Sequence, residues 1–307
     1  MKNNTLISIV GPTAIGKTRV SIEIAKALKT EIISCDSRQF FKEMNIGTAV
    51  PSHGELKAVP HHFIQHISIF DDYSVGKYEK EALKLVNEKF KTHKTLCLTG
   101  GSGLYQKAVI DGLDYFPDVD ENIRKVLNDK YKTDGLKPLQ SQLKKLDPVY
   151  YKNVDISNPH RLIRALEICI GTSKPYSYFI NTNKSKHRNF SSLKIGLTAD
   201  RKIIYNRIER RVDNMIEEGL VKEAKSLYPF RNLNALQTVG YKELFDFFDG
   251  KISLEKAIEE IKKNTRRYAK RQLTWYRKQD DINWFDFQVE TNEIIDHIHK
   301  KTRSTQS

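Results

Sequence analysis

The sequence predicts an α/β fold: a doubly wound parallel sheet core with a helical insertion domain and a helical C-terminal part. Three observations predict it. Short apolar, β-branched runs alternate with segments of helical spacing over the first 110 or so residues. A glycine-rich loop joins the first such run to the first helical segment. From about residue 118 to 187 the pattern is helical, with no evident strand.

The strands of the core are predicted in chain order from their apolar runs. "TLISIV" at 5–10 is expected to be a buried strand, and helical spacing follows in "TRVSIEIAKALK". Further strands are expected at "EIIS", "TLCLT" and "LKIGLTAD". Beyond about residue 203 the chain is expected to be mostly helical.

The insertion is predicted to occupy residues 118–187, within a core formed by 1–117 and 188–307. Its segments "ENIRKVLNDKY", "LKPLQSQLKKLD" and "NPHRLIRALEICI" all have helical spacing. Asn158 and Pro159 suit the cap and first turn of the last of these helices. A polar connector, "NTNKSKHRNFSS", is expected to return the chain to the core.

The composition and net charge limit the classes of partner and the cellular compartment to be expected. The 307 residues are 39% hydrophobic, enough for a sizeable core, and 52 Lys and Arg against 38 Asp and Glu leave a net charge of +14. Such a charge favours nucleic acid, a lipid surface or a phosphorylated substrate, although surface lysines without a partner are an alternative. Cys35, Cys97 and Cys169 lack paired spacing and indicate buried thiols in a reducing cytoplasm. No apolar run reaches the roughly 18 residues of a membrane span.

The loop "GPTAIGKT" fits the phosphate-binding pattern G-x-x-x-x-G-K-[ST] and predicts a P-loop NTPase-like core, typical of nucleotide-binding and ATP-binding proteins. Its backbone amides would surround a phosphate, the Lys17 ammonium would add charge, and the Thr18 hydroxyl would hold Mg²⁺. The motif leaves open whether the phosphates belong to ATP or to another diphosphate. The loop residues are Gly11, Pro12, Thr13, Ala14, Ile15, Gly16, Lys17 and Thr18.

Asp36 is the acidic candidate at the carboxyl edge of the sheet, directly after the second strand. It suits a metal ligand, a general base or a helix cap about equally. The strand "TLCLT" ends instead in Thr99, Gly100 and Gly101, so it lacks the carboxylate that hydrolytic P-loop ATPases usually carry there.

Residues 255–278 predict a helix with a basic face and an apolar, aromatic face. The basic face favours a polyanion such as a phosphate backbone, with a solvated surface as the alternative. The basic stripe comprises Lys263, Arg267, Lys270, Arg271, Arg277 and Lys278. The opposite stripe comprises Ile258, Ile261, Tyr268, Ala269, Trp275 and Tyr276.

Two smaller patterns remain open. "RRVDNMIEEGL" places an arginine pair at the expected start of another helix, where one arginine either reaches the loop's anion or forms a surface salt bridge. His62 and His66 have metal-ligand spacing, but no further ligand cluster is visible, so the roles of His61, His62 and His66 are undecided.

Taken together, the motifs resemble those of the tRNA dimethylallyltransferases, or tRNA isopentenyltransferases, of the bacterial type. The resemblance runs from Leu6 to about Asp286. It is carried by "GPTAIGKT", "DSRQFFKEMNIGTA", "PHHFI", "GGSGLYQKAVIDGL", "NPHRLIRALEI", "RRVDNMIEEGL", "QTVGYKEL" and "RQLTWYR". It implies transfer of the dimethylallyl group from dimethylallyl diphosphate to N6 of the adenine 3′-adjacent to the anticodon, in tRNAs reading codons that begin with U.

The resemblance also implies residue roles. Lys17, Thr18 with Mg²⁺ and Arg211 would stabilise the leaving diphosphate, and Asp36 would accept the amine proton. Ser102 and His160 stand where the family often has Thr and Gln. A cytoplasmic monomer is expected. The residues implied to bind the tRNA anticodon stem-loop are Asp36, Ser37, Arg38, Gln39, Ser102, Arg124, His160, Arg161, Leu162, Ile163, Arg164, Gln237, Thr238, Val239, Gly240, Tyr241 and Lys242.

Other functions compete with this one. A P-loop nucleoside or nucleotide kinase would use the same loop and Mg²⁺. An RNA-binding protein with an inactive loop is a second alternative, although Lys17, Thr18 and Asp36 are intact. Prenylation of a free adenosine nucleotide is a third, and the long insertion and basic helix argue against it.

Overall fold

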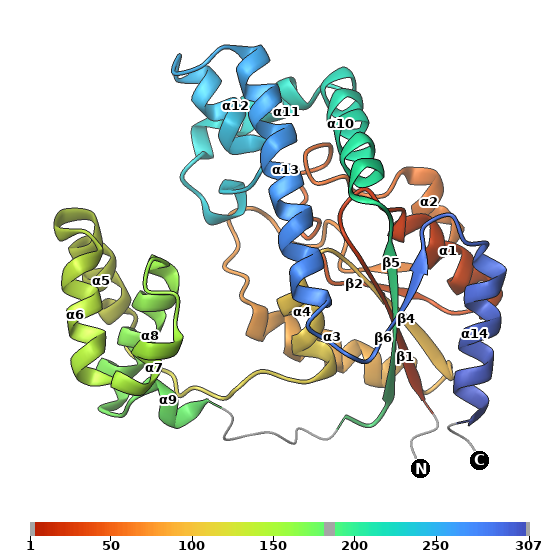
Figure 1. The fold of residues 1–307 in the computed structure, drawn as a ribbon, viewed down its shortest axis with the longest axis horizontal. Helices are drawn as coiled ribbons and strands as arrows, with labels where there is room; N and C mark the ends of the chain where they lie inside the picture. The colour runs from red at the N-terminus through yellow and green to blue at the C-terminus, as the bar shows by residue number, and fades with distance from the viewer. Residues whose placement is uncertain (1–3, 181–187, 305–307) are drawn as a thin grey trace. The chain divides into compact units, whose positions relative to one another are not determined.

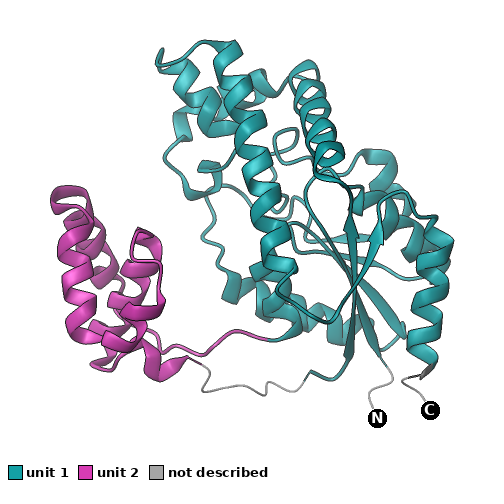
Figure 2. Ribbon diagram, viewed as in Figure 1, with its two compact units in different colours: residues 1–111, 188–307 teal, residues 112–187 magenta. Residues whose placement is uncertain are grey.

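The computed structural model describes residues 4–180 and 188–304, and in them the chain forms two compact units. The first unit comprises residues 1–111 and 188–307, and the second comprises 112–187 (Figure 2). The helical insertion was predicted to begin slightly later, at residue 118. The expected polar connector lies largely at 181–187, outside the described residues.

The first unit is built on a parallel six-stranded sheet with the strand order β3-β2-β4-β1-β5-β6 (Figure 1). β1 lies between β4 and β5, with Ile7 opposite Cys97 on one side and Leu193 on the other. This confirms the predicted α/β class. The strands are β1 Thr5–Val10, β2 Ile32–Ser34, β3 His61–His62, β4 Thr95–Thr99, β5 Ser191–Thr198 and β6 Ile282–Asp286.

Alternate residues of β1 enter two hydrophobic cores, one on each face of the sheet. Ile7 and Ile9 pack with helices α1, α10 and α14, whereas Leu6 packs with α3 and α4. Because both faces are covered, the central strands β1 and β4 are largely apolar, as the sequence predicted. These helices and the short α2 are α1 Lys17–Ala27, α2 His53–Ala58, α3 Val75–Lys89, α4 Gly103–Ile110, α10 Arg201–Glu217 and α14 Thr291–Ser304.

A helical lobe follows α10 and has its own core around Leu220, Leu236, Tyr241 and Ile261. The long helix α13 carries residues of this core and, nearer its end, Ala269 of the sheet core, so it connects the lobe to the sheet. The lobe elements are α11 Leu220–Leu227, η1 Tyr228–Phe230, η2 Asn234–Leu236, α12 Tyr241–Phe248 and α13 Leu254–Tyr276.

The second unit is helical and surrounds a core of leucine, isoleucine and alanine side chains. The side chain of Asn158 accepts a hydrogen bond from the Arg161 amide and Pro159 occupies the first turn, so the predicted cap of α8 is confirmed. The helices are α5 Glu121–Asp134, α6 Leu136–Leu146, α7 Pro148–Asn153, α8 Pro159–Thr172 and α9 Tyr176–Phe179.

Three sequence predictions need correction. Arg210 and Arg211 lie in the second half of α10 rather than at a helix start, because the helix begins at Arg201. α13 ends at Tyr276, so Arg277 and Lys278 follow it. The C-terminal part contains β6, which no pattern predicted, since its partner β5 lies far back in the sequence.

Two expectations about the chain as a whole can be compared with the described residues. Cys35, Cys97 and Cys169 are free and buried, as predicted. Among the helices described, none combines the length and the apolar composition needed to span a bilayer.

Candidate active site

A cavity of about 1860 Å³ lies in the first unit, where the carboxyl ends of β1, β2 and β4 meet the lobe. This edge is where doubly wound sheets bind ligands. The cavity is lined by the glycine-rich loop, the segment after β2, the turn after β4, part of α10, the residues before α12, and α13. Segments distant in the sequence therefore share one site.

The glycine-rich loop has the backbone that its motif predicted. Gly11 has a φ of 144°, and a Cβ built there would lie 2.5 Å from the carbonyl oxygen of Leu197, so only glycine fits. Gly16 caps α1 in a left-handed conformation, and the helix begins at Lys17. The loop amides thus lie at a helix N-terminus, which favours an anion.

Lys17 points into the loop rather than into solvent. Its Nζ donates hydrogen bonds to the carbonyl oxygens of Gly11, at 3.0 Å, and Pro12, at 2.9 Å. Burial lowers the pKa of Lys17 to about 8, and the nearby Asp36 carboxylate partly opposes this shift. Lys17 is therefore a half-buried, partly desolvated cation whose charge a bound anion would stabilise.

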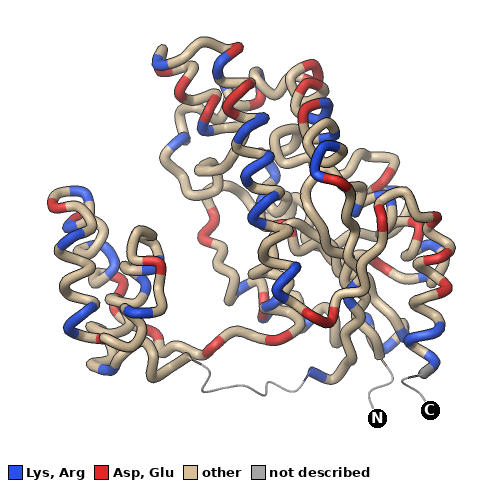
Figure 3. The backbone as a smooth tube through the Cα atoms, in the orientation of Figure 1, with Lys and Arg blue, Asp and Glu red and all other residues tan. Residues whose placement is uncertain are grey.

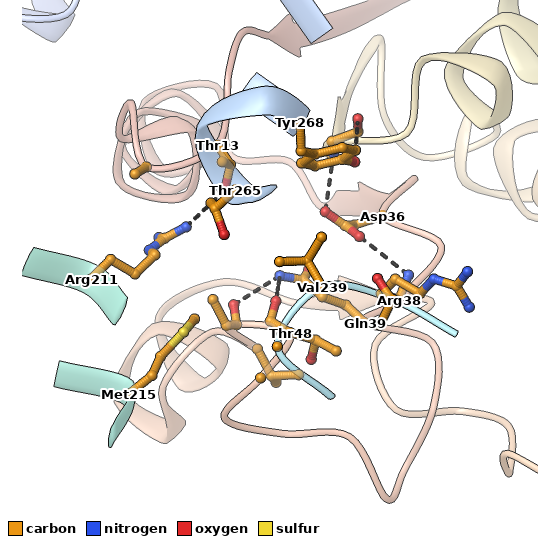
Figure 4. A pocket seen from close by; sticks show the side chains of 18 of the residues that line it. Thr13, Asp36, Arg38, Gln39, Thr48, Arg211, Met215, Val239, Thr265 and Tyr268 are labelled. Carbon is orange, nitrogen blue, oxygen red and sulfur yellow. Dashed lines mark hydrogen bonds between the residues drawn. The ribbon is translucent and has the colours of Figure 1, made fainter. Parts of the chain in front are cut away.

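Arg211 supplies a second cation to the loop from α10. Its Nη1 donates to Thr13 Oγ1 at 3.2 Å, and it forms no ion pair with any residue that the structure describes (Figure 4). Burial is the main cause that lowers its pKa, and Arg207 contributes. Of the two alternatives for the arginine pair, the geometry favours contact with the loop, because Arg211 reaches it while Arg210 is exposed.

Arg207 was missed in the sequence, although it lies one helical turn before Arg211 and shares its face. Its Nε donates to the carbonyl oxygen of Ala14 at 2.7 Å, which steadies the loop. The signal that could have identified it is its four-residue spacing to Arg211 beside the buried Ile204 and Ile208.

Asp36 lies on the opposite wall of the same cavity. Its Oδ2 accepts the amide of Gly101, and its Oδ1 accepts the amide of Arg38, both at 3.2 Å (Figure 4). No helix begins beside it in this described segment, where residues 37–40 form turns, so the helix-cap alternative fails. Two backbone amides orient the carboxylate and leave lone pairs for a ligand.

The turn after β4 is held by two side chains from α13. The carbonyl oxygen of Gly101 accepts from Tyr268 Oη, at 3.1 Å, and from Gln272 Nε2, at 2.8 Å. Gln272 Oε1 accepts the Thr13 amide at 2.8 Å, so it bridges both walls of the cavity. Tyr268 was expected on a buried apolar stripe; instead its hydroxyl faces the site, and burial raises its pKa.

Several residues implied to bind RNA line this cavity, but in the structure they form hydrogen bonds with other protein groups. The Ser37 amide donates to Ser102 Oγ at 3.1 Å, and Gln39 Nε2 donates to the carbonyl oxygen of Ala49 at 2.8 Å. Arg38 Nη1 donates to the carbonyl oxygen of Ala235 at 2.9 Å. The expected residues that line the cavity are Asp36, Ser37, Arg38, Gln39, Ser102, Gln237, Thr238, Val239, Gly240 and Lys242.

The remaining implied RNA contacts differ in exposure. Tyr241 is fully buried in the lobe core, and Leu162 and Ile163 are buried in the second unit. These three side chains are therefore unavailable to RNA. His160 and Arg161, by contrast, are exposed at the start of α8.

Arg124 and Arg164 converge on one carboxylate in the second unit. Arg124 donates to both oxygens of Glu167, from Nε at 3.1 Å and from Nη2 at 2.9 Å, and Arg164 Nη1 donates at 2.8 Å. The two arginines lower the pKa of Glu167, although its burial opposes them. Both guanidinium groups keep exposed surface for a second, anionic partner.

The site offers oxygen donors that fit Mg²⁺. The Thr18 hydroxyl and the Asp36 carboxylate line one cavity, and Mg²⁺ prefers a few protein oxygens together with water and phosphate oxygens. Among the described residues, no three His, Cys, Asp or Glu side chains gather as a metal site. A protein-only metal centre is thus absent there, and Mg²⁺ would come with a phosphorylated ligand.

The three histidines do not form a cluster in the structure. His62 Nε2 contacts Glu31 Oε2 at 2.5 Å, and His61 Nδ1 contacts the carbonyl oxygen of Val59 at 2.8 Å. His66 packs against aromatic rings, including Phe40 and Tyr73. Among the residues described, these histidines belong to no group of side chains that could hold a metal ion.

Proteins of known family resemble this chain over nearly its whole length. A sequence profile described as IPP transferase matches residues 39–279. The tRNA dimethylallyltransferase of Christiangramia forsetii is 60% identical over 299 residues, which cover 97% of this chain and 99% of that protein. The chain belongs to the IPP transferase family. The tRNA dimethylallyltransferase of Flavobacterium johnsoniae, another similar member, is 55% identical over 306 residues, or 98% of this chain and 99% of its own.

Solved structures of IPP transferase relatives share this fold over most of its length. A full-length tRNA isopentenylpyrophosphate transferase from Bacillus halodurans aligns with a TM-score of 0.74 and 39% identity, covering 99% of this chain and 98% of that one. A eukaryotic dimethylallyltransferase acting on tRNA gives a TM-score of 0.77 and 26% identity, covering 92% and 74%. The family and the P-loop-like fold predicted from the motifs are both confirmed.

Proposed function

We propose that this chain transfers the dimethylallyl group of dimethylallyl diphosphate to N6 of an adenine in tRNA, the base 3′-adjacent to the anticodon in tRNAs reading codons that begin with U. One observation carries the proposal: a fixed carboxylate, Asp36, faces the same cavity as the half-buried cations Lys17 and Arg211. The cations suit a leaving diphosphate, and the carboxylate suits the attacking amine.

The reaction needs strong stabilisation of the leaving group, because the adenine amine is a poor nucleophile. Its lone pair is delocalised into the ring, and cleavage of the allylic C–O bond can run ahead of attack because the allyl cation is stabilised by resonance. The developing negative charge falls on the diphosphate, where Lys17, Arg211 and the loop amides would stabilise it. Mg²⁺ held through Thr18 would add Lewis-acid stabilisation to the same oxygens.

Asp36 would act on the amine as general base. As the N6–C bond forms and the C–O bond breaks, N6 gains positive charge and releases a proton to the carboxylate. The hydrogen bonds from the Gly101 and Arg38 amides fix the direction of this acceptor. Nitrogen is thereby alkylated, diphosphate leaves, and the proton passes from Asp36 to solvent.

The cavity has an apolar part that suits a short prenyl chain. Met215 and Val239 line it near Arg211 and Thr265 (Figure 4). A five-carbon hydrocarbon tail gains free energy by leaving water for such a surface. The cavity thus offers cations to the diphosphate and apolar surface to the group that is transferred.

The RNA requires the target base to leave its stack, at a cost of a few kcal/mol. Contacts with the RNA backbone must offset this cost. Lys and Arg residues are distributed along α13 and along several helices of the second unit (Figure 3), consistent with the net charge of +14. We expect the protein to act in the cytoplasm as a monomer, with the second unit contacting the anticodon stem-loop.

Incubation of the purified protein with labelled dimethylallyl diphosphate, Mg²⁺ and undermodified tRNA, followed by nucleoside analysis, tests the proposal. N6-dimethylallyladenosine is expected only when all components are present. A parallel reaction with labelled ATP tests the kinase alternative, which family membership disfavours. Phosphoryl transfer without alkylation of RNA would overturn the proposal, as would alkylation of a free adenosine nucleotide in preference to tRNA.

A further inference from the structure

Trp275 lies at the rim of the cavity and has no role in the reaction described so far. It was expected on the buried stripe of α13, yet 39% of its surface is exposed. It is near the end of the helix and lines the cavity together with Leu104 and Arg271. Tryptophan side chains are highly buried on average in folded proteins, so the exposed part of Trp275 at the mouth of a site calls for an explanation.

The backbone of the turn after β4 fixes the position of the indole ring. A Cβ built on Gly103 would lie 2.3 Å from Trp275 Nε1 and 2.5 Å from its Cδ1, so the ring rests against the glycine backbone. The ring is therefore held in place on one side while part of it remains exposed. Its N–H has no acceptor among the described residues.

The ring is connected to the catalytic carboxylate through a short, rigid path. Tyr268, Gln272 and Trp275 lie on one face of α13, and the first two hold Gly101. Gly101 in turn donates to Asp36. A base stacked on Trp275 would thus lie near the base that reaches Asp36.

The surroundings of the ring favour a nucleic acid over a protein. Leu104, 47% exposed, extends the apolar surface, and Arg271 lies over the Tyr268 ring, 5.7 Å from its centroid. Arg271 forms no ion pair with the residues described, and the stretch 261–279 contains no Asp or Glu. Aromatic faces beside unpaired cations are the pattern of single-stranded nucleic-acid sites.

We propose that Trp275, with Leu104 and Arg271, forms a base-stacking platform for the nucleotide next to the target adenine. Stacking there would hold the anticodon loop open while the target base lies in the cavity. The inference deepens the proposed function and depends on RNA being the substrate. It assigns to this chain a binding surface whose test uses RNA alone.

The first test uses fluorescence. The chain contains two tryptophans, so Trp284→Phe leaves Trp275 as the single emitter. Addition of an anticodon stem-loop RNA, without dimethylallyl diphosphate, is expected to quench this emission saturably. Saturable RNA binding that leaves the emission of Trp275 unchanged would overturn the proposal.

The second test separates stacking from packing by means of two substitutions. Trp275→Phe keeps an aromatic face, whereas Trp275→Leu keeps apolar bulk only. We expect Trp275→Leu to weaken stem-loop binding by about 5- to 100-fold and Trp275→Phe to recover most of it. Equal losses in both variants would indicate simple packing on Gly103 and overturn the platform, and so would equal, unchanged affinities.

An RNA variant completes the design. An abasic site at a nucleotide adjacent to the target should weaken binding to the wild-type protein but scarcely affect the Trp275→Leu variant, because the stacking partner is already absent. If the abasic site and Trp275→Leu lower the binding free energy additively, whichever of the two neighbouring nucleotides is abasic, the proposal is contradicted. If Trp275→Leu keeps the wild-type affinity for RNA but changes the oligomeric mass of the protein, the surface around Trp275 contacts another protein chain rather than RNA.

These measurements distinguish the two proposals. Failure of alkylation alongside coupled RNA binding would overturn the proposed reaction and leave the platform intact. Normal alkylation, without quenching of Trp275 emission by RNA and without coupling between Trp275 and the neighbouring nucleotide, would overturn the platform and leave the proposed reaction intact.

Discussion

The Asp36 carboxylate rests against the backbone of Gly101, whose amide donates to Asp36 Oδ2 at 3.2 Å. A Cβ built on Gly101 would lie 3.0 Å from this oxygen and 2.7 Å from Gln272 Nε2. Gly101→Ala should therefore displace the carboxylate and lower kcat by about 10- to 100-fold, because small displacements of a reacting group are costly. Single-turnover alkylation of tRNA measures the effect.

Gly54→Ala provides a matched control. Gly54 lies in α2, and a Cβ built there meets no atom within 4 Å. This variant should keep wild-type kinetics and stability equal to or slightly above that of the wild type, since alanine favours helix. If Gly101→Ala were as active as Gly54→Ala, close contact with the Gly101 backbone would not be needed to orient Asp36.

Removal of the charge on Asp36 tests its role as proton acceptor. Asp36→Asn keeps the shape of the side chain and one of its two hydrogen bonds with the Gly101 and Arg38 amides, because the side-chain NH2 group cannot accept. The alkylation rate should fall by about 10²-fold or more, while the Kd for the stem-loop RNA changes little. A variant that turns over at near the wild-type rate would show that the proton leaves by another route.

Arg211 and Arg210 form a pair that separates a functional cation from a surface one. Arg211 contacts Thr13, whereas Arg210 is exposed on α10. Arg211→Ala should raise the KM for dimethylallyl diphosphate by about 10- to 100-fold, because a charged hydrogen bond to the diphosphate is lost. The KM for tRNA should stay within a few-fold. Arg210→Ala is the control, and equal effects of the two substitutions would refute the assignment.

These arginines illustrate what the sequence could and could not predict. Features fixed by neighbours in the chain were predicted correctly: the glycine-rich loop, strands β1 and β4, and the Asn158 cap. The contact of Arg211 with Thr13 depends on where α10 lies against the loop, and no local pattern contains that information.

The same limit applies to α13 and β6. A helical stripe assigned Tyr268 and Trp275 to a single apolar face, but that helix meets the lobe, the sheet core and the cavity along its length. Strand β6 is stabilised by pairing with β5, such as Ile195 opposite Asn283, across a long sequence separation. Tertiary contacts decided both features.

The lowered pKa of Lys17 predicts a pH dependence for diphosphate binding. Its pKa in the free protein is about 8, below the ordinary 10.5, chiefly because of burial. Below pH 8 the ammonium is charged and ready to bind. Above pH 8 binding must take up a proton, so the Kd for inorganic diphosphate with Mg²⁺ should rise by up to about tenfold per pH unit.

The matched control for this titration is Lys17→Arg, whose guanidinium stays charged over the whole pH range. Protonation of the diphosphate itself affects wild type and variant equally. The difference between the two pH profiles isolates Lys17. Without ligand, the folded state binds fewer protons than the unfolded chain between pH 8 and 10.5, and the free energy of unfolding should rise with pH in that window. Parallel binding profiles for wild type and Lys17→Arg would contradict the pKa assignment.

Charge reversal along α13 tests its contact with RNA and distinguishes paired from unpaired cations. Lys263 forms an ion pair with Glu260, at 2.6 Å, whereas Lys270 and Arg271 are exposed and unpaired among the described residues. Lys270→Glu with Arg271→Glu should weaken stem-loop binding and reduce the slope of log Kd against log salt by about 1 per lost phosphate contact. Titration at several salt concentrations measures this slope.

Lys263→Glu is the control, since its charge is already neutralised by Glu260 in the free protein. It should change the salt slope much less than the double variant. The comparison isolates the position of a charge from its sign when the change in slope is expressed per substituted residue, because each substitution places an acid on the same helix. Equal salt slopes for wild type and the double variant would mean that the exposed cations of α13 are solvated in the complex as well, and that the RNA backbone follows another surface.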